Sequence, residues 1–494
     1  MTPPWSIYRA RSTDIEANDN RVADVRGGSI ENAWLLSLWC HAPVVMAIRV
    51  CSFCGLREDE VETLVEGPRR TAICAVCVDL AADLVKERLT PAGGDLILDN
   101  IGTLATNDPR FAGVLGVVTD AAVAIRRGRI AWSGPSERIP QGLDALARLD
   151  CEGRTVLPGL IDAHTHLLFA GERSREFSLR MVGIPETEAA LRAGGAESTV
   201  AATHSLDADE FADVLSARLE RMLENGTTTV EASAGYCIDY DAELDLLEIA
   251  GMVHRRQPVD LVRTFDIVDL PLLPADRPET LQHLVASVFP EIGDIADAVR
   301  VSCGKGSLSV FEAHQLLQAA AALGLRTRIH SGPAAPGELQ QLALDSGARV
   351  IDHCANMDHA RAVALGEAGA AAVVTPTTVL ANREENPNLH QLVDAGVPIA
   401  LGTDCSPAPL MVESLPLAIS LAVLEMGLTP DQAVWSATRG SAIALDLRDK
   451  GWIGHGAIAD LLILDADSPS HIAYQPGSDV VWKVFKQGVP VVSR

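Results

Sequence analysis

The sequence predicts an α/β protein whose main body is a TIM-like (β/α)8 barrel. Three observations lead to this prediction. Eight short apolar segments between residues 155 and 450 alternate with segments of helical period. Strand-like segments flank this region at residues 91–154 and 451–494, which predicts a small β-sandwich built from both flanks of the chain. Two Cys-x-x-Cys pairs within residues 46–90 predict a treble-clef-like, four-cysteine zinc module before the barrel.

Composition narrows the possible partners. The 494 residues include 40 Lys and Arg against 66 Asp and Glu, a net charge of −26. This charge repels phosphate backbones, so we expect no nucleic-acid partner. The longest apolar stretch, Ala33–Ile48, is interrupted by polar residues and shorter than the ~20 residues of a membrane span, so we expect no membrane association. Ten cysteines are too few for a disulfide framework and favour a reducing, cytoplasmic location.

Residues 1–45 show no clear period, and we treat them as an uncharacterised extension and a candidate for disorder. The zinc module follows directly. Nineteen residues, Gly55 to Ile73, separate its two cysteine pairs, so four thiolates can form a closed tetrahedral zinc site. The predicted ligands are Cys51, Cys54, Cys74 and Cys77. The alternatives are free thiols or a redox pair. Met46, just before the module, is an alternative start of the chain.

The sandwich and barrel strands are predicted from short apolar runs between turn signals. The sandwich strands are Asp95–Asp99, Ala121–Ile125, Arg129–Trp132, Ala459–Leu464, Val480–Phe485 and Val489–Val492. The barrel strands are Val156–Ala163, Thr227–Ala232, Leu261–Ile267, Val299–Ser302, Arg326–His330, Val350–His353, Ala371–Val374 and Pro398–Gly402. Between them, Ala208–Asn225 has the apolar stripe of a helix, and Thr429 with Pro430 predicts the start of another.

Chemistry in such barrels gathers at the carboxyl ends of the strands. The first strand ends in Asp-Ala-His164-Thr-His166, and residues two apart in an extended chain point the same way. His330, His353 and Asp404 end three further strands. Each histidine alone is more typical of a hydrogen-bonded core position, but five such groups at one end of a barrel predict a divalent metal site.

The zinc module resembles a known family. Cys-Ser-Phe-Cys-Gly at 51–55, Glu-Gly-Pro at 66–68 and Ile-Cys-x-x-Cys-Val-Asp-Leu at 73–80 are similar to the zinc-binding domain of the ClpX unfoldase subunit. In that family the module dimerises and docks adaptors or substrates. We find no G-x-x-x-x-G-K-[ST] loop, so the ATPase is not implied.

The rest of the chain, from about residue 95 to 494, resembles the amidohydrolase superfamily. The shared motifs are Leu157–His166, Gly226–Thr229, Gly402–Asp404 and Gly456-x-x-Ala-Asp-Leu461. Within the superfamily the resemblance is closest to the imidazolonepropionase group, ring-opening hydrolases of histidine breakdown. That likeness rests on His164–Arg173, Arg192–Thr203, Gly226–Glu231, Gly235-Tyr236 and Asp239.

The resemblance implies roles for individual residues. His164, His166, His330 and Asp404 would bind one catalytic metal, with zinc preferred and iron or manganese as alternatives. Such a metal lowers the pKa of bound water to about 7. Asp404 would act as general base, and His353 would donate to the substrate carbonyl as it becomes an oxyanion. Arg173 and Tyr236 would contact the substrate. The alternative for Arg173 is a salt bridge to a barrel loop.

Departures from the family motif predict a different substrate. Pro333 stands where the family carries a Glu three residues after the histidine that ends the fifth strand, here His330. Gly304 stands where the family carries a second Glu, after the fourth strand. Asp269 replaces a histidine, which favours a cationic or hydrogen-bond-donating group on the substrate. Ser406, Ala408 and Pro409 replace the family's Asn, Gly and Ser, so we expect Ser406 in the altered lining. Lys305 lies between glycines, which favours a mobile loop over a lysine that bridges two metals.

Three functions remain open from the sequence. The first is a metal-dependent hydrolase that cleaves a C–N bond of a cyclic amide or related ring in a small molecule. The second is a hydrolytic deaminase of a nitrogen heterocycle, which the missing Glu disfavours. The third is a non-catalytic adaptor that binds partners through its zinc module. We also expect a homodimer, and a protein partner for the zinc module, by resemblance.

Overall fold

The computed structural model describes a small unit within residues 7–90 and a large unit within residues 91–494. The described residues are 57, 61, 63–66, 72–75, 77–78, 95–143, 146–237, 240–267, 277–302, 308–330, 338–354, 358–387 and 389–494. Several predictions lie outside this set: those on residues 1–45, Met46, Cys51, Cys54, Asp239, Asp269, Gly304, Lys305 and Pro333.

In the small unit, β1 (Leu64–Glu66) pairs antiparallel with β2 (Ala72–Cys74). The hairpin leads into the second cysteine pair. Cys74 and Cys77 are both buried, and Val61 and Ile73 pack against them. Buried cysteines at a hairpin end agree with a zinc knuckle, which needs its thiolates shielded from solvent.

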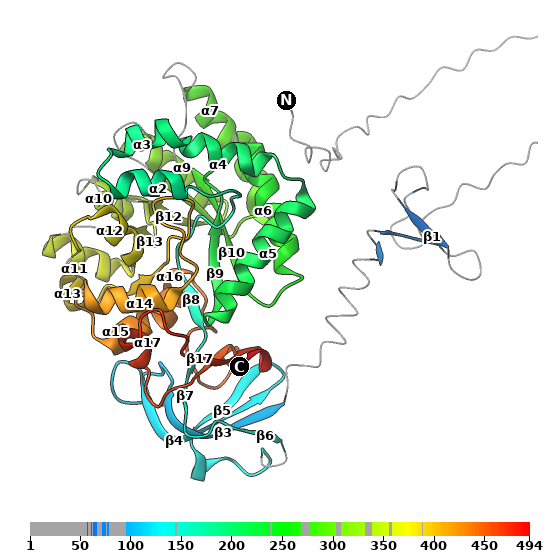
Figure 1. The fold of residues 1–494 in the computed structure, drawn as a ribbon, viewed down its shortest axis with the longest axis vertical. Coiled ribbons are helices and arrows are strands. Elements are labelled where there is room, and N and C mark those ends of the chain that lie inside the picture. Colours follow the sequence, from blue (N-terminus) through cyan, green and yellow to red (C-terminus); the bar gives the residue numbers. More distant parts are fainter. Residues whose placement is uncertain are drawn as a thin grey trace, which may run out of the picture. The chain divides into compact units, whose positions relative to one another are not determined.

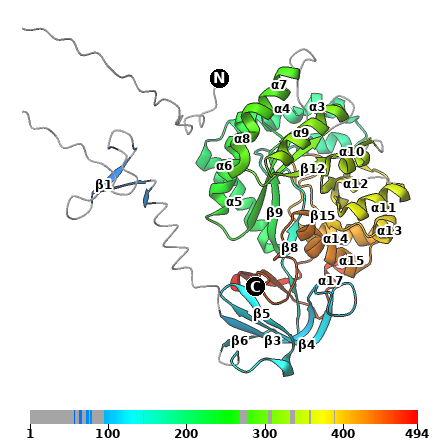
Figure 2. The same ribbon diagram turned by 180° about the vertical axis from the view of Figure 1, so that it is seen from behind.

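The barrel consists of eight parallel strands in sequence order (Figure 1). They are β8 (Leu160–Asp162), β9 (Thr227–Ser233), β10 (Asp260–Ile267), β11 (Ala298–Ser302), β12 (Arg326–His330), β13 (Val350–Asp352), β14 (Ala371–Val374) and β15 (Ile399–Leu401). The ring closes between β15 and β8, which lie near each other in Figure 2. The amide of Ala163 donates to the carbonyl of Leu401 at 3.1 Å, and the amide of Asp404 donates to the carbonyl of His164 at 3.0 Å. The predicted TIM-like barrel is confirmed.

Helices surround the barrel (Figures 1 and 2). The longer ones are α2 (Ser174–Met181), α3 (Glu186–Ala193), α4 (Gly195–His204), α5 (Ala208–Glu224), α6 (Tyr240–His254), α7 (Arg277–His283), α9 (Val310–Ala322), α10 (Glu338–Ser346), α11 (His359–Ala368), α12 (Pro376–Asn382), α13 (Leu389–Asp394), α14 (Leu415–Leu424) and α15 (Pro430–Trp435). Helix α15 starts at the predicted Thr429 cap, and a π-helical turn η5 (Ser436–Gly440) and α16 (Ser441–Ala444) follow it. Among the described residues, no helix combines the length and apolarity that a bilayer crossing requires.

Both flanks of the barrel contribute strands to one eight-stranded sheet, where the sequence predicted a small β-sandwich. Its strands are β3 (Leu96–Ala105), β4 (Val117–Arg126), β5 (Arg129–Pro135), β6 (Ala147–Asp150), β7 (Thr155–Pro158), β16 (Leu461–Leu464), β17 (Val481–Lys486) and β18 (Val489–Ser493). The order is β18-β17-β16-β7-β3-β4-β5, and β6 also pairs with β3. The two flanks meet where β16 pairs antiparallel with β7. Leu98, Val123 and Phe485 belong to the core of this sheet.

The predicted strand Val156–Ala163 is wrong as a single element. It is two strands in two different sheets: β7 belongs to the flanking sheet and β8 to the barrel. Gly159 separates them. A Cβ at Gly159 would lie 2.4 Å from the side chain of Thr228, so only glycine lets the chain cross here without displacing β9. An apolar run gives no sign of such a change of sheet, because both strands are buried.

A buried charge cluster joins the flanking sheet to the barrel. Lys486 Nζ lies 2.6 Å from Asp260 Oδ2 and 2.7 Å from Asp460 Oδ2, and Lys450 contacts the same two carboxylates. Burial would raise the pKa of Asp260, but the two ammonium groups hold it well below its usual value. The cluster is therefore a balanced set of two cations and two anions.

We predict that Lys486→Met lowers the free energy of unfolding by about 3 kcal/mol, because it leaves the two carboxylates of the cluster with a single cation, Lys450. The measurement is urea unfolding followed by circular dichroism. Lys483→Met on the same strand is the matched control, because Lys483 lies over Trp482 and has no ion pair in the described part of the chain. Equal losses in the two variants would show that the cluster contributes no more than a half-buried lysine without an ion pair.

Candidate metal centre

The five residues predicted for a metal site come together at the carboxyl end of the barrel. His164 and His166 follow β8, His330 ends β12, and His353 and Asp404 follow β13 and β15. Ligand atoms of His164, His166 and His330 lie within 4.8 Å of one another, and so do those of His164, His353 and Asp404. The spacing brings three imidazoles within reach of one ion.

Asp404 lies between these histidines. Its Oδ1 is 3.5 Å from His164 Nε2 and 3.8 Å from His166 Nε2, while its Oδ2 is 3.9 Å from His353 Nε2. Asp404 and His353 both adopt left-handed backbone conformations, with φ of 51° and 52°. Such conformations are costly for non-glycine residues and concentrate at functional sites, where the surrounding structure maintains them.

The residues present fit a metal ion. Asp404 Oδ1 and His330 Nδ1 are buried and have no hydrogen-bond partner among the described residues. A buried carboxylate oxygen without a donor is costly, and a cation would satisfy it. Imidazole nitrogens with one carboxylate oxygen are also the donor set that zinc takes in catalytic sites.

The protonation states of three of these rings suit metal binding, and for His330 burial lowers the pKa well below its usual value. Burial and the Arg300 guanidinium lower the pKa of His166 to about 3, and burial lowers the pKa of His353 to about 4, so both rings are neutral at pH 7. Burial and Arg300 also act to lower the pKa of His164, but Asp352 and Asp404 outweigh them and hold it at about 9. A metal ion must therefore displace a proton from His164.

A second layer of charged residues, which the sequence reasoning missed, surrounds the histidines. Asp352 Oδ1 lies 3.2 Å from His164 Nδ1, and Asp266 Oδ2 lies 3.5 Å from His166 Nδ1. Each carboxylate has its own buried arginine: Arg328 Nε donates to Asp352 at 3.1 Å, and Arg300 Nε donates to Asp266 at 3.0 Å. Carboxylates in this position fix the tautomer and the ring orientation of metal-binding histidines.

Arg300 also lies close to the same ring nitrogens. Its Nη1 and Nη2 are 2.9 Å from His164 Nδ1 and 3.2 Å from His166 Nδ1. A guanidinium donates but cannot accept, whereas an imidazole that binds a metal through Nε2 carries its proton on Nδ1. If His164 and His166 bind a metal through Nε2, the carboxylates of Asp352 and Asp266 are the partners that their Nδ1–H groups need.

We predict that Asp352→Asn weakens metal binding 10- to 100-fold, the usual range for the loss of such a partner. The amide keeps the shape but removes the charge that Arg328 balances. Competition with a chelator of known affinity measures the change. Asp358→Asn, at an exposed helix cap, is the control. Unchanged affinity in Asp352→Asn would exclude the carboxylate from support of the metal site.

Two threonines that follow β14 contact the other members of the site. Thr375 Oγ1 lies 2.9 Å from His353 Nδ1, and Thr378 Oγ1 donates to Asp404 Oδ2 at 2.5 Å. If the Thr375 hydroxyl donates, the proton of the neutral His353 ring is on Nε2, which lies 3.1 Å from His164 Nε2 and 3.9 Å from Asp404 Oδ2. The seventh strand contributes no metal ligand but orients two of the central groups.

The predicted substrate contacts have mixed outcomes. Tyr236 lies beside the metal site, with its ring centre 6.2 Å from that of His166. Arg173 forms a bidentate salt bridge with the buried Glu176, at 2.6 Å from Nη2 to Oε1, so the alternative salt bridge is present. Ser406 is buried and its hydroxyl donates to the carbonyl of Ala408 at 2.8 Å.

Family comparison agrees with this geometry. The amidohydrolase family model matches residues 155–491, so the chain belongs to the amidohydrolase family, metal-dependent hydrolases that act on C–N bonds. The ClpX C4-type zinc finger model matches residues 49–87.

Within the family, this chain is similar to imidazolonepropionases. The imidazolonepropionase of Mycolicibacterium smegmatis is 38% identical over 395 residues, which cover 80% of this chain and 96% of the relative. That of Salinispora arenicola is 39% identical over 401 residues, which cover 80% and 98%.

Solved structures share the fold. A triazine hydrolase variant superposes with a TM-score of 0.63 at 18% identity and covers 81% of this chain and 95% of its own. A zinc-bound adenosine deaminase from Xanthomonas campestris gives a TM-score of 0.60 at 20% identity, with 81% and 93% covered. At these identities the match concerns the fold alone.

Proposed function

We propose that this chain hydrolyses a C–N bond in a cyclic amide or related ring, and that His164, His166, His330 and Asp404 hold one divalent metal ion for that reaction. The observation that carries the proposal is that ligand atoms of His164, His166 and His330 lie within 4.8 Å of one another. Two of these rings adjoin Asp404 Oδ1, a buried oxygen without a hydrogen-bond partner among the described residues. Zinc is the preferred ion because the donor set suits it, with iron and manganese as alternatives.

The chain's own residues supply the proton transfers. When bound, the metal lowers the pKa of a water molecule and polarises the substrate carbonyl. Burial raises the pKa of Asp404, but the adjacent His164, whose own pKa is about 9, acts to hold it well below its usual value, so it is ionised and able to accept a proton. With the Thr375 hydroxyl as donor to Nδ1, neutral His353 carries its proton on Nε2 and would donate it to the carbonyl oxygen as negative charge develops there.

On the substrate side, Tyr236 and Arg173 line the approach to the metal. Glu176 occupies Nε and Nη2 of Arg173 and leaves Nη1 for an anionic group of the substrate. Asp269 and Ser406 belong to the altered lining that we infer from the sequence. We therefore propose a substrate related to, but different from, the one that names the imidazolonepropionases.

A substrate panel tests the proposal. Zinc-loaded protein is incubated with imidazolonepropionate, hydantoin and dihydrouracil as cyclic amides, and with adenine and cytosine as amino-heterocycles. Mass spectrometry separates ring-opened acids from deaminated products. We expect a ring-opened acid that disappears after chelation of the metal. Ammonia release from an amino-heterocycle alone would favour the deaminase. Metal in the cysteine module but none in the barrel would favour the adaptor.

We further propose, by resemblance to the ClpX module, that residues 46–90 bind another protein or a second copy of this chain. Multi-angle light scattering of the full chain and of a chain without residues 1–90 tests this. A dimer that becomes monomeric on deletion supports the module as the contact. A particle that still contains two chains after the deletion would place the dimer contact on the barrel unit.

A further inference from the structure

Helices α2 and α3 form a hairpin that packs weakly on the rest of the barrel unit. They follow β8 and lie at the end of the barrel away from the flanking sheet (Figures 1 and 2). Glu176 is the only buried residue of α2, and Ala189 is the only buried residue of α3. Helices of eight residues are not stable alone in water and depend on packing. Most of the surface of this hairpin is therefore free for another contact.

The outer face of α2 is largely apolar. Five exposed residues occupy positions i, i+3, i+4, i+7 and i+8, the spacing of a single helix face, and they are Ser174, Phe177, Ser178, Met181 and the C-cap residue Val182. Phe177 and Met181 are each 36% exposed, and Val182 is 77% exposed. The Ser178 hydroxyl donates to the carbonyl of Ser174 at 2.9 Å, so it is satisfied within the helix. Neighbouring large apolar side chains on a solvent face are typical of an interaction surface.

The charge of the hairpin favours a second copy of this chain as its partner. Residues 172–193 contain four acidic and four basic side chains, which are Glu172, Glu176, Glu186, Glu188, Arg173, Arg175, Arg180 and Arg192. The hairpin is therefore neutral, whereas the whole chain carries −26. Two copies of so acidic a chain repel each other over most of their surface, and a neutral region lets them approach.

Two unpaired charges of the hairpin suit a two-fold contact. Arg175 borders the apolar face in the first turn of α2, and Glu186 begins α3, just beyond the other end of α2. Both are exposed, and neither has an ion pair in the described part of the chain. A two-fold axis across the middle of α2 exchanges its two ends. Arg175 of each copy would then lie near Glu186 of the partner subunit and near the negative carboxyl end of the partner's α2.

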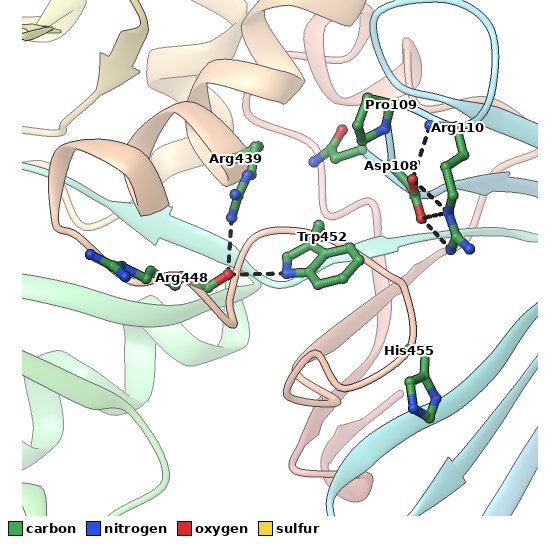
Figure 3. Close-up of a pocket in the computed structure, with 8 residues that line it drawn as sticks. Asp108, Pro109, Arg110, Arg439, Arg448, Trp452 and His455 are labelled. Atoms are coloured by element: carbon green, nitrogen blue, oxygen red, sulfur yellow. Dashed lines mark hydrogen bonds and ion pairs between the residues drawn. The ribbon is translucent and has the colours of Figure 1, made fainter. Parts of the chain in front are cut away.

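The cavity in Figure 3, with a volume of about 390 Å3, is a different kind of surface. Four of its eight lining residues are charged. Arg110 pairs with Asp108 there, at 2.8 Å from Nε to Oδ2. Arg439 Nη1 donates to the carbonyl of Lys450 at 3.0 Å and to that of Arg448 at 3.4 Å. These contacts are made within the chain, whereas the outer face of α2 has no such partner among the described residues.

We propose that the outer face of α2 binds the same face of a second copy of this chain, antiparallel and about a two-fold axis. Phe177, Met181 and Val182 would be buried between the copies, and two pairs of Arg175 with Glu186 would border them. This contact belongs to the barrel unit. It is independent of the reaction proposed above and separate from the contact proposed for residues 46–90.

Sedimentation velocity of the full, metal-loaded chain tests the proposal. We expect an assembly of at least two chains in the wild type. Val182→Glu should raise the dissociation constant of this contact at least about tenfold, because it buries a carboxylate in an apolar contact. Leu424→Glu, at the exposed end of α14, is the matched control and should leave the assembly unchanged. A monomeric wild type, or a Val182→Glu variant that assembles as the wild type does, would overturn the proposal.

An exchange of charges tests the two-fold arrangement. At low salt, Arg175→Glu and Glu186→Arg should each weaken the contact at least about threefold, because each change puts like charges together in both pairs. An equal mixture of the two variants should regain the affinity of the wild type, since both pairs of a mixed dimer again join opposite charges. Misfolding could not be reversed by mixing. A mixture that assembles no better than the single variants would contradict the two-fold contact.

Discussion

Replacement of Asp404 by Asn should reduce hydrolysis by at least about 10³-fold while the fold is retained. Asn cannot take a proton at neutral pH, and its NH2 group places a donor where the carboxylate presents an acceptor. The change is also gentle to the backbone. Asp404 has a φ of 51°, and Asn is among the residues that tolerate this left-handed region best. Loss of activity would therefore report on chemistry and metal binding rather than on unfolding.

Asp446→Asn is the matched control for this experiment. Asp446 also adopts a left-handed conformation, with a φ of 52°, but it lies near the amino-terminal end of the barrel, where it pairs with Arg326. The same substitution in the same backbone conformation should leave turnover within about twofold of wild type. If Asp404→Asn keeps more than about a tenth of wild-type turnover, Asp404 is not the general base.

Replacement of Arg300 by Met should lower the free energy of unfolding by about 3–5 kcal/mol, the largest stability effect that we expect in the barrel. Arg300 is fully buried and donates to Asp266, and it lies 3.4 Å from Glu231 Oε1. Its removal leaves Asp266 in the interior without its cation, and leaves Glu231 with Arg328 alone, at 3.8 Å. Chemical denaturation followed by tryptophan fluorescence measures the loss.

A double-mutant cycle separates the pair from other effects. Arg300→Met with Asp266→Leu removes both charges, and an apolar pair of similar volume is often tolerated in place of a buried ion pair. The double variant should therefore be more stable than Arg300→Met alone. A single variant that loses less than about 1 kcal/mol, or a double variant that loses the sum of the two single losses, would show that the two side chains are not coupled.

The sequence predicted the barrel and its five central groups because both depend on local patterns. Apolar runs mark the strands, and polar residues at the carboxyl end of such a run point to the site, as for His330 and Asp404. The N-cap at Thr429 was predictable for the same reason, since a cap depends on four consecutive residues.

The supporting charges were not predicted because they depend on register between strands. Asp266, Arg300 and Arg328 are direct neighbours across β10, β11 and β12. A single charge within an apolar strand is most simply assigned to an exposed edge. Opposite charges at matched positions of three successive strands were the available signal, and they require the strand alignment before they can be recognised. The split of β7 from β8 was missed for a similar reason, because it depends on the space that Thr228 leaves for Gly159.

Metal content per chain tests the central claim most directly. Three full-length proteins are compared by inductively coupled plasma mass spectrometry: the wild type, a variant with Cys51, Cys54, Cys74 and Cys77 changed to Ser, and a variant with His164→Ala and His166→Ala. We predict two ions per wild-type chain and one in each variant. A wild type with a single ion that persists after both histidines are replaced would contradict a metal centre in the barrel.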